Sequence, residues 1–248
     1  MPSTPIKIFT LGLFEIFKGE APIRFQVKAP CRPWMLLKAI LSLGGQAVCE
    51  EQACEILWPE SEGDLAHQAL ATTLHRLRKR LGDGKTIALR DGKLSLNREL
   101  CWVDAWALEE SLDQAEKILS HQKMPGENDA IDRALSLYRG PFLEGENALF
   151  CAISLRERLR SRLLRTLESL GRFLEEARAW EKAATYYRRG LEADPLAERF
   201  YRRLAVCYKH LGYPGEAIAI DHRRREIFAA LLETAPSSGE SRKPVTYL

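Results

Sequence analysis

Several patterns that define whole classes of protein are missing from this sequence. No stretch approaches the roughly 18 uncharged apolar residues of a membrane-spanning helix, so we expect a cytoplasmic protein with no membrane partner. The six cysteines form no Cys-x-x-Cys pair, which excludes a zinc ribbon and a thioredoxin-type redox site. We therefore expect reduced, mostly buried thiols and no bound metal.

Motifs of catalysis and nucleotide binding are missing as well. The sequence has no His-Glu-x-x-His zinc motif and no Gly-x-Ser-x-Gly nucleophile elbow, and its five histidines stand singly. Gly84-Lys85-Thr86 looks like the end of a P-loop, but the first glycine of that motif would fall on Lys79, and a predicted helix precedes it. We predict that the chain is not an enzyme and binds no cofactor.

What the sequence does contain is an uneven distribution of charge. The 248 residues are 46% hydrophobic and 29% charged, which is enough for two domains with apolar cores, and the net charge is only +3. Residues 50–64 carry six acidic side chains and no basic one, whereas residues 65–90 carry six basic side chains and one acidic. Positive charge concentrated on one predicted helix is typical of nucleic-acid-binding proteins.

The first hundred residues change their hydrophobic period twice. Residues 6–17 and 23–27 alternate apolar and polar side chains, which predicts a small antiparallel sheet. Segments with helical spacing then lie between Pro33 and Gly44, over residues 51–58 and over residues 65–81. Two short apolar runs follow and flank Asp91-Gly92, a dipeptide suited to a type I′ hairpin turn. Together these elements predict a winged helix-turn-helix.

The third predicted helix has two different faces. Leucines spaced four, three and four residues apart, Leu70, Leu74, Leu77 and Leu81, line the face that should pack inward. Arginine and lysine suit phosphates or guanine, glutamine suits adenine, and threonine offers a hydroxyl. A solvated helix face has a similar composition, but the adjacent hairpin and the charge contrast favour double-stranded DNA as partner. The candidate DNA-binding residues of this helix are Gln68, Thr72, His75, Arg76, Lys79 and Arg80.

The remainder of the chain is predicted to be helical. Helices are expected from Trp106 to about His121, over residues 131–138 and over residues 148–176, with a loop at 122–128. Ala183 and Ala217 stand 34 positions apart in similar contexts, which is the period of tetratricopeptide repeats. Such repeats form concave surfaces for protein partners, although a plain scaffold or a dimerisation surface would show the same pattern.

These observations predict a mainly α fold with a small β component. A winged-helix domain should occupy residues 1–100, an all-α tetratricopeptide-like domain residues 101–235, and a flexible tail residues 236–248.

Several short motifs, in this order and spacing, also resemble a known family over nearly the whole chain. They are Leu11-Gly12-Leu13-Phe14, Leu57-Trp58-Pro59, residues 74–82 (LHRLRKRLG), Trp102-Val103-Asp104, residues 137–143 (LYRGPFL) and residues 194–198 (DPLAE). Together they resemble the Streptomyces antibiotic regulatory protein type of transcriptional activator. Each motif alone is weak, and the combination is specific.

The resemblance implies an OmpR-like winged helix followed by a tetratricopeptide-like bacterial transcriptional activator domain. Such activators bind direct repeats, which implies self-association on DNA, and they recruit RNA polymerase. By resemblance, the third helix enters the major groove, the hairpin tip reaches the adjacent minor groove or backbone, and the pair of domains can be the output part of a longer regulator. The hairpin lacks the Gly-Tyr pattern common in OmpR-like proteins, but Lys93 can still meet a phosphate. The implied polymerase-contact loop comprises Trp58, Glu60, Glu62 and Asp64.

A protein-interaction module is the rival interpretation. In this interpretation the repeats form the protein-binding surface, and the winged helix does not bind DNA by itself. The two readings differ in salt dependence, because a DNA-binding helix displaces counterions from the duplex whereas a protein platform does not.

Overall fold

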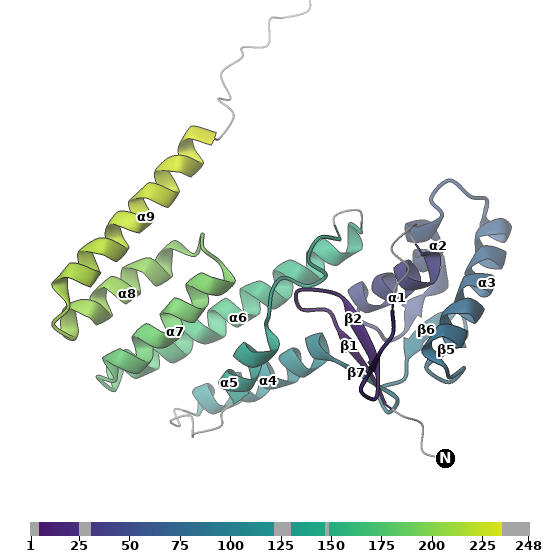
Figure 1. Ribbon diagram of the computed structural model, residues 1–248, viewed down its shortest axis with the longest axis horizontal. Helices are drawn as coiled ribbons and strands as arrows, with labels where there is room; N and C mark the ends of the chain where they lie inside the picture. The colour runs from purple at the N-terminus through teal and green to yellow at the C-terminus, as the bar shows by residue number, and fades with distance from the viewer. Residues whose placement is uncertain (1–4, 25–30, 122–129, 147–148, 235–248) are drawn as a thin grey trace, which may run out of the picture. The chain divides into compact units, whose positions relative to one another are not determined.

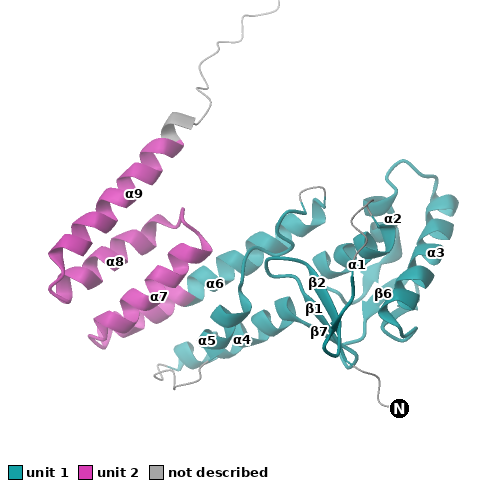
Figure 2. Ribbon diagram, viewed as in Figure 1, with its two compact units in different colours: residues 1–166 teal, residues 167–248 magenta. Residues whose placement is uncertain are grey.

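The computed structural model describes residues 5–24, 31–121, 130–146 and 149–234 (Figure 1). The fold is mainly α with two small sheets, as predicted from the sequence. The chain divides into two compact units, residues 1–166 and 167–248 (Figure 2), and helix α6 (Cys151–Glu176) contributes residues to both. The predicted loop at 122–128 and tail at 236–248 lie outside the described residues.

The first sheet has the strand order β3-β2-β1-β7. Strands β1 (Ile6–Phe9), β2 (Glu15–Lys18) and β3 (Ala21–Pro22) are antiparallel neighbours, which confirms the predicted sheet. The strand predicted over residues 11–17 begins only at Glu15, because the chain turns at Gly12, whose φ is 92°. The strand predicted over 23–27 was wrong in its placement: Ile23 and Arg24 follow β3, and the rest lies outside the described residues.

Strand β7 (Cys101–Val103) pairs with β1 in parallel, a partnership that the sequence pattern did not indicate. The carboxylate of Asp104, directly after β7, then binds the chain where it leaves β1. It accepts hydrogen bonds from the backbone N–H groups of Thr10 (2.8 Å) and Leu11 (3.0 Å) and from the Thr10 hydroxyl (2.6 Å). Burial raises the pKa of Asp104, and these hydrogen bonds oppose that rise because they favour the charged form.

A second segment docks on the same part of the chain. Phe142 forms an isolated antiparallel bridge with Leu11, the N–H of Gly12 donates to the carbonyl of Pro141 (3.0 Å), and the N–H of Leu143 donates to the carbonyl of Thr10 (2.7 Å). Leu11, Phe142 and Leu143 are buried. A Cβ on Gly140 would lie 3.1 Å from the Gly12 Cα, so the two backbones approach closely. We call residues 10–12 together with 139–144 the joint.

Three helices form the core of the N-terminal part: α1 (Arg32–Ser42), α2 (Glu50–Leu57) and α3 (Gly63–Leu81). Each packs against the other two. Helix α1 is buried on most sides, including positions such as Leu37 and Leu41 outside the single apolar stripe expected for it. Its central place between the other helices explains this burial.

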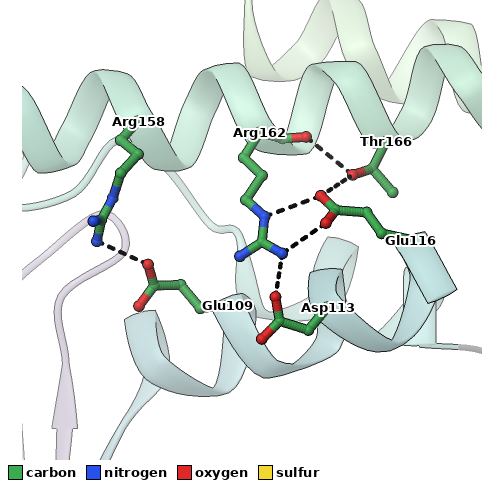
Figure 3. A network of polar contacts seen from close by, with 6 residues as sticks. All are labelled: Glu109, Asp113, Glu116, Arg158, Arg162 and Thr166. Carbon is green, nitrogen blue, oxygen red and sulfur yellow. Dashed lines mark hydrogen bonds and ion pairs between the residues drawn. The ribbon is translucent and has the colours of Figure 1, made fainter.

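The rest of the first unit contains α4 (Asp104–Ser120), α5 (Ala130–Leu137) and the first part of α6. Charged side chains connect α4 to α6 (Figure 3). The guanidinium of Arg162 pairs with Asp113 and Glu116, and Arg158 pairs with Glu109 at 2.8 Å. The hydrogen bonds from Arg162 lower the pKa of Glu116.

The second unit stacks α7 (Trp180–Ala193), α8 (Glu198–His210) and α9 (Pro214–Thr234). Helix α8 packs against both α7 and α9. Ala183 and Ala217 are both buried, as the repeat period required. Gly171 and Gly190 leave room for the rings of Tyr187 and Phe200, since a Cβ at either glycine would lie within 2.6 Å of the ring. The predicted tetratricopeptide-like helix pairs are therefore present.

The cysteines are free, but only three of them are buried: Cys54, Cys101 and Cys207. The expectation of mostly buried thiols was too strong, because Cys31 and Cys49 directly precede helices and Cys151 begins one, where the surface is near. Burial raises the pKa of Cys101 and of Cys207 to about 12, which keeps these two thiols protonated and unreactive.

Candidate nucleic-acid interface

The ends of α3 carry opposite charges. Asp64 lies in the first turn, and Arg78, Lys79 and Arg80 lie in the last. This order complements the helix dipole, which is positive at the start of a helix and negative at its end. Gly82 terminates the helix in the left-handed conformation, with φ of 78°, and its N–H donates to the carbonyl of Arg78. The basic end of α3 is thus fixed by local sequence.

The two faces of α3 lie as the periodicity predicted. All four leucines of the inward face are buried, with Leu77 and Leu81 fully covered. The candidate DNA-binding side chains are all exposed: Gln68, Thr72, His75, Arg76, Lys79 and Arg80. The structure therefore gathers them on one solvent-facing surface, although Arg80 also lies over the ring of Trp34, with its guanidinium carbon 5.8 Å from the ring centroid.

Arg78 differs from the basic residues around it. Its Nε donates a 2.9 Å hydrogen bond to the carbonyl oxygen of Ile87 in β5. This bond ties the end of α3 to the first strand of the hairpin, so Arg78 positions the hairpin and does not belong to the exposed row. Sequence reasoning counted Arg78 only as a positive charge. The one signal available was its position at the flank of the helix, next to the leucine face.

The hairpin has the predicted turn and one unpredicted strand. Strands β5 (Ile87–Arg90) and β6 (Lys93–Leu96) are antiparallel, and both Asp91 and Gly92 have positive φ, 49° and 69°, as a type I′ turn requires. Strand β4 (Val48–Cys49) pairs with β6 on the other side. The N–H of Glu50 also donates to the carbonyl of Gly92 (2.9 Å). The hairpin tip, with Lys93 exposed, is thereby anchored to the start of α2.

The connection between α2 and α3 presents the acidic side chains as an exposed group. Glu60, Glu62 and Asp64 are all exposed, whereas Trp58 is half-buried. Arg32 donates to the carbonyl of Leu57, and its guanidinium lies over the ring of Trp58, 5.8 Å from the centroid. Of the four residues predicted to form one loop, Asp64 instead lies in the first turn of α3, and the tryptophan is held against α1.

The described residues contain neither a metal-binding cluster nor a membrane-spanning helix. Among the described residues there is no group of three or more His, Cys, Asp or Glu side chains placed to hold a metal ion. None of the helices in the described part of the chain is long and apolar enough to cross a membrane.

Comparison with known protein families identifies the class. Residues 103–241 match the profile of the bacterial transcriptional activator domain. The match covers more than half of the chain, so the chain belongs to the bacterial transcriptional activator domain family. This is a family of transcription regulators and not of enzymes.

One solved structure shows the same fold over nearly the whole chain. The chain is similar to Mycobacterium tuberculosis EmbR, solved in complex with a low affinity phosphopeptide, with a TM-score of 0.68 and 15% sequence identity. The similarity covers 94% of this chain and 62% of EmbR, so the chain spans less than two thirds of the length of that protein. At this identity the likeness establishes the fold alone.

A second structure, the TPR domain of Arabidopsis FLU, matches 53% of this chain and 99% of its own, with 18% identity. Its TM-score of 0.27 is too low to support a shared fold. A comparison with curated proteins found no match.

Proposed function

We propose that this chain is a sequence-specific DNA-binding transcriptional activator that reads the major groove with α3. The observation that carries the proposal is the exposed row on α3, which is backed by a buried leucine face and ends in exposed basic side chains. The type I′ hairpin beside it offers Arg90 and Lys93, both exposed, to a neighbouring phosphate strand. Membership of the activator family supports the same role.

The activation step is assigned to the acidic connection between α2 and α3. Glu60, Glu62 and Asp64 are exposed next to the recognition helix, so a DNA-bound protomer can present them to RNA polymerase. Binding to direct repeats brings a second copy onto the same DNA. We further propose that residues 1–100, as a winged helix, carry DNA recognition and residues 101–235 carry the activator function, and that the two together are the output part of a longer regulator, although part of the second segment completes the core of the first. The partial coverage of EmbR is consistent with this.

The test is selection of genomic fragments by the whole chain, followed by salt titration of binding to the enriched duplex. Lys79→Ala should weaken binding and reduce the slope of log affinity against log salt by about one, because one phosphate contact releases about one counterion. Lys182→Ala, an exposed lysine of α7, is the matched control and should leave the slope unchanged.

Enrichment of a spaced direct repeat with a shallower slope for Lys79→Ala supports the proposal. Failure to enrich any duplex at low salt contradicts it and favours the interaction-module interpretation.

A further inference from the structure

Besides the polar candidate residues, the exposed surface of α3 carries one large apolar side chain. Leu65 is 59% exposed in the first turns of the helix. It stands three residues before Gln68 and four before Ala69, and helical geometry places side chains at these spacings on one face. Leu65 therefore begins the same row that continues through Gln68 and Thr72.

Small side chains follow Leu65 on this face of α3. Ala69 and Thr72, which follow Leu65 at four and seven positions, have small side chains, and Thr72 is exposed. Small side chains let a second surface approach the helix backbone closely, whereas the long basic side chains follow only from Arg76 onward. Along its length the exposed row is first apolar, then polar, and finally basic.

This order assigns different parts of a duplex to different parts of α3. The basic end suits the phosphate strands. Glu62 and Asp64 are exposed beside Leu65, and their carboxylates disfavour contact of this end with phosphates. The base edges are then the part of the duplex left for Leu65.

In the major groove the base edges present one apolar group, the C5 methyl of thymine, while adenine offers the donor and acceptor pair that suits glutamine. Leu65 and Gln68 are separated by about 4.5 Å along the helix axis, and neighbouring base pairs by about 3.4 Å. We propose that Leu65 contacts a thymine methyl group next to the base pair read by Gln68. Leu65 is then a specificity-determining residue, and this inference rests on the proposed DNA binding by α3.

The test replaces thymine by uracil, which differs only in lacking the methyl group. The duplex enriched by the whole wild-type chain is resynthesised with deoxyuridine at each thymine in turn. At one thymine we expect an affinity loss of about fourfold, the effect of removing one methyl-sized group from an apolar contact. Leu65→Ala should bind the unmodified duplex more weakly and should not respond to deoxyuridine at that position.

Controls separate this contact from general effects. Leu13→Ala removes a leucine that is 75% exposed on the connection between β1 and β2, and it should keep the wild-type response to deoxyuridine. Because Leu65 is exposed, Leu65→Ala should melt at the wild-type temperature.

The possible results distinguish this inference from the proposed function. If duplexes are enriched but no deoxyuridine substitution matters, or if Leu65→Ala responds as the wild type does, the thymine contact is overturned while DNA binding stands. Leu65 is then free for a protein partner. If no duplex is enriched at all, the proposed function fails, and this inference fails with it.

Discussion

Three consecutive residues of α3 point in three directions. Arg76 is exposed, Leu77 is fully buried, and Arg78 donates to the carbonyl of Ile87 in the hairpin. Helical geometry turns each side chain about 100° from the one before it, so one short motif serves the proposed DNA contact, core packing and hairpin placement. The consequences of substitution should therefore differ sharply between neighbours.

At the residue scale, Leu77→Ala should lower the free energy of unfolding by about 2 to 5 kcal/mol, because truncating a fully buried leucine leaves a cavity. Arg76→Ala should leave stability nearly unchanged and weaken binding to the enriched duplex. Urea unfolding followed by circular dichroism, with a binding titration of the same samples, measures both. A loss of stability in Arg76→Ala, or none in Leu77→Ala, would mean that α3 is rotated relative to the register described above.

At the scale of elements, both strands of the hairpin are held to the helices of the N-terminal part and to the segment that connects α1 and α2. Arg78 ties β5 to the end of α3, and β4 with Glu50 ties β6 and the turn to the start of α2. A two-stranded hairpin alone is at best marginally stable in water. These contacts hold the tip at a defined place beside α3, as the proposed DNA contact of Lys93 requires.

We expect Arg78→Met to loosen the hairpin without unfolding α3. Methionine keeps an apolar stem but loses the donor, at a cost of about 0.5 to 1.5 kcal/mol for one hydrogen bond. Amide hydrogen exchange should accelerate in β5 and β6 and stay slow at Leu74 and Leu77. Arg80→Met, which removes a more exposed arginine of the same turn, is the matched control. Unchanged exchange in the hairpin of Arg78→Met would show that the contacts of β6 and the turn position it without Arg78.

At the scale of the whole molecule, the winged-helix part shares its core with the chain that follows it. Strand β7 completes the first sheet, Asp104 binds Thr10 and Leu11, and Phe142 and Leu143 bury Leu11 at the joint. The compact unit accordingly continues to Thr166, although the predicted domain boundary falls near residue 100.

Residues 1–100 expressed alone should therefore fail to show a cooperative thermal transition. The truncation exposes Leu11 and Ile8 and removes the acceptors of the backbone N–H groups of Thr10, Leu11 and Gly12, each a substantial penalty when left unpaired. Residues 1–176, which end with α6, should melt cooperatively. Calorimetry of both fragments checks this. A sharp transition for residues 1–100 would show that the joint is not needed for folding.

The sequence by itself determined the local features of this protein. Period and turn chemistry located α3, its leucine face, its exposed basic row and the Asp91-Gly92 turn, because each depends on residues a few positions apart. The 34-residue spacing likewise indicated the helix pairs of the second unit. Most of the candidate interface is of this local kind, so most of it could be predicted.

Only the tertiary structure decided which distant segments meet. The pairing of β7 with β1, the addition of β4 to the hairpin and the joint between residues 10–12 and 139–144 all bring together residues far apart in the chain. The hydrogen bond from Arg78 to Ile87 and the exposure of Leu65 were likewise decided by the structure, because neither follows from the spacing of residues along one helix. Hydrophobic period identifies a buried face but not the partner that covers it, and these partners position the candidate interface.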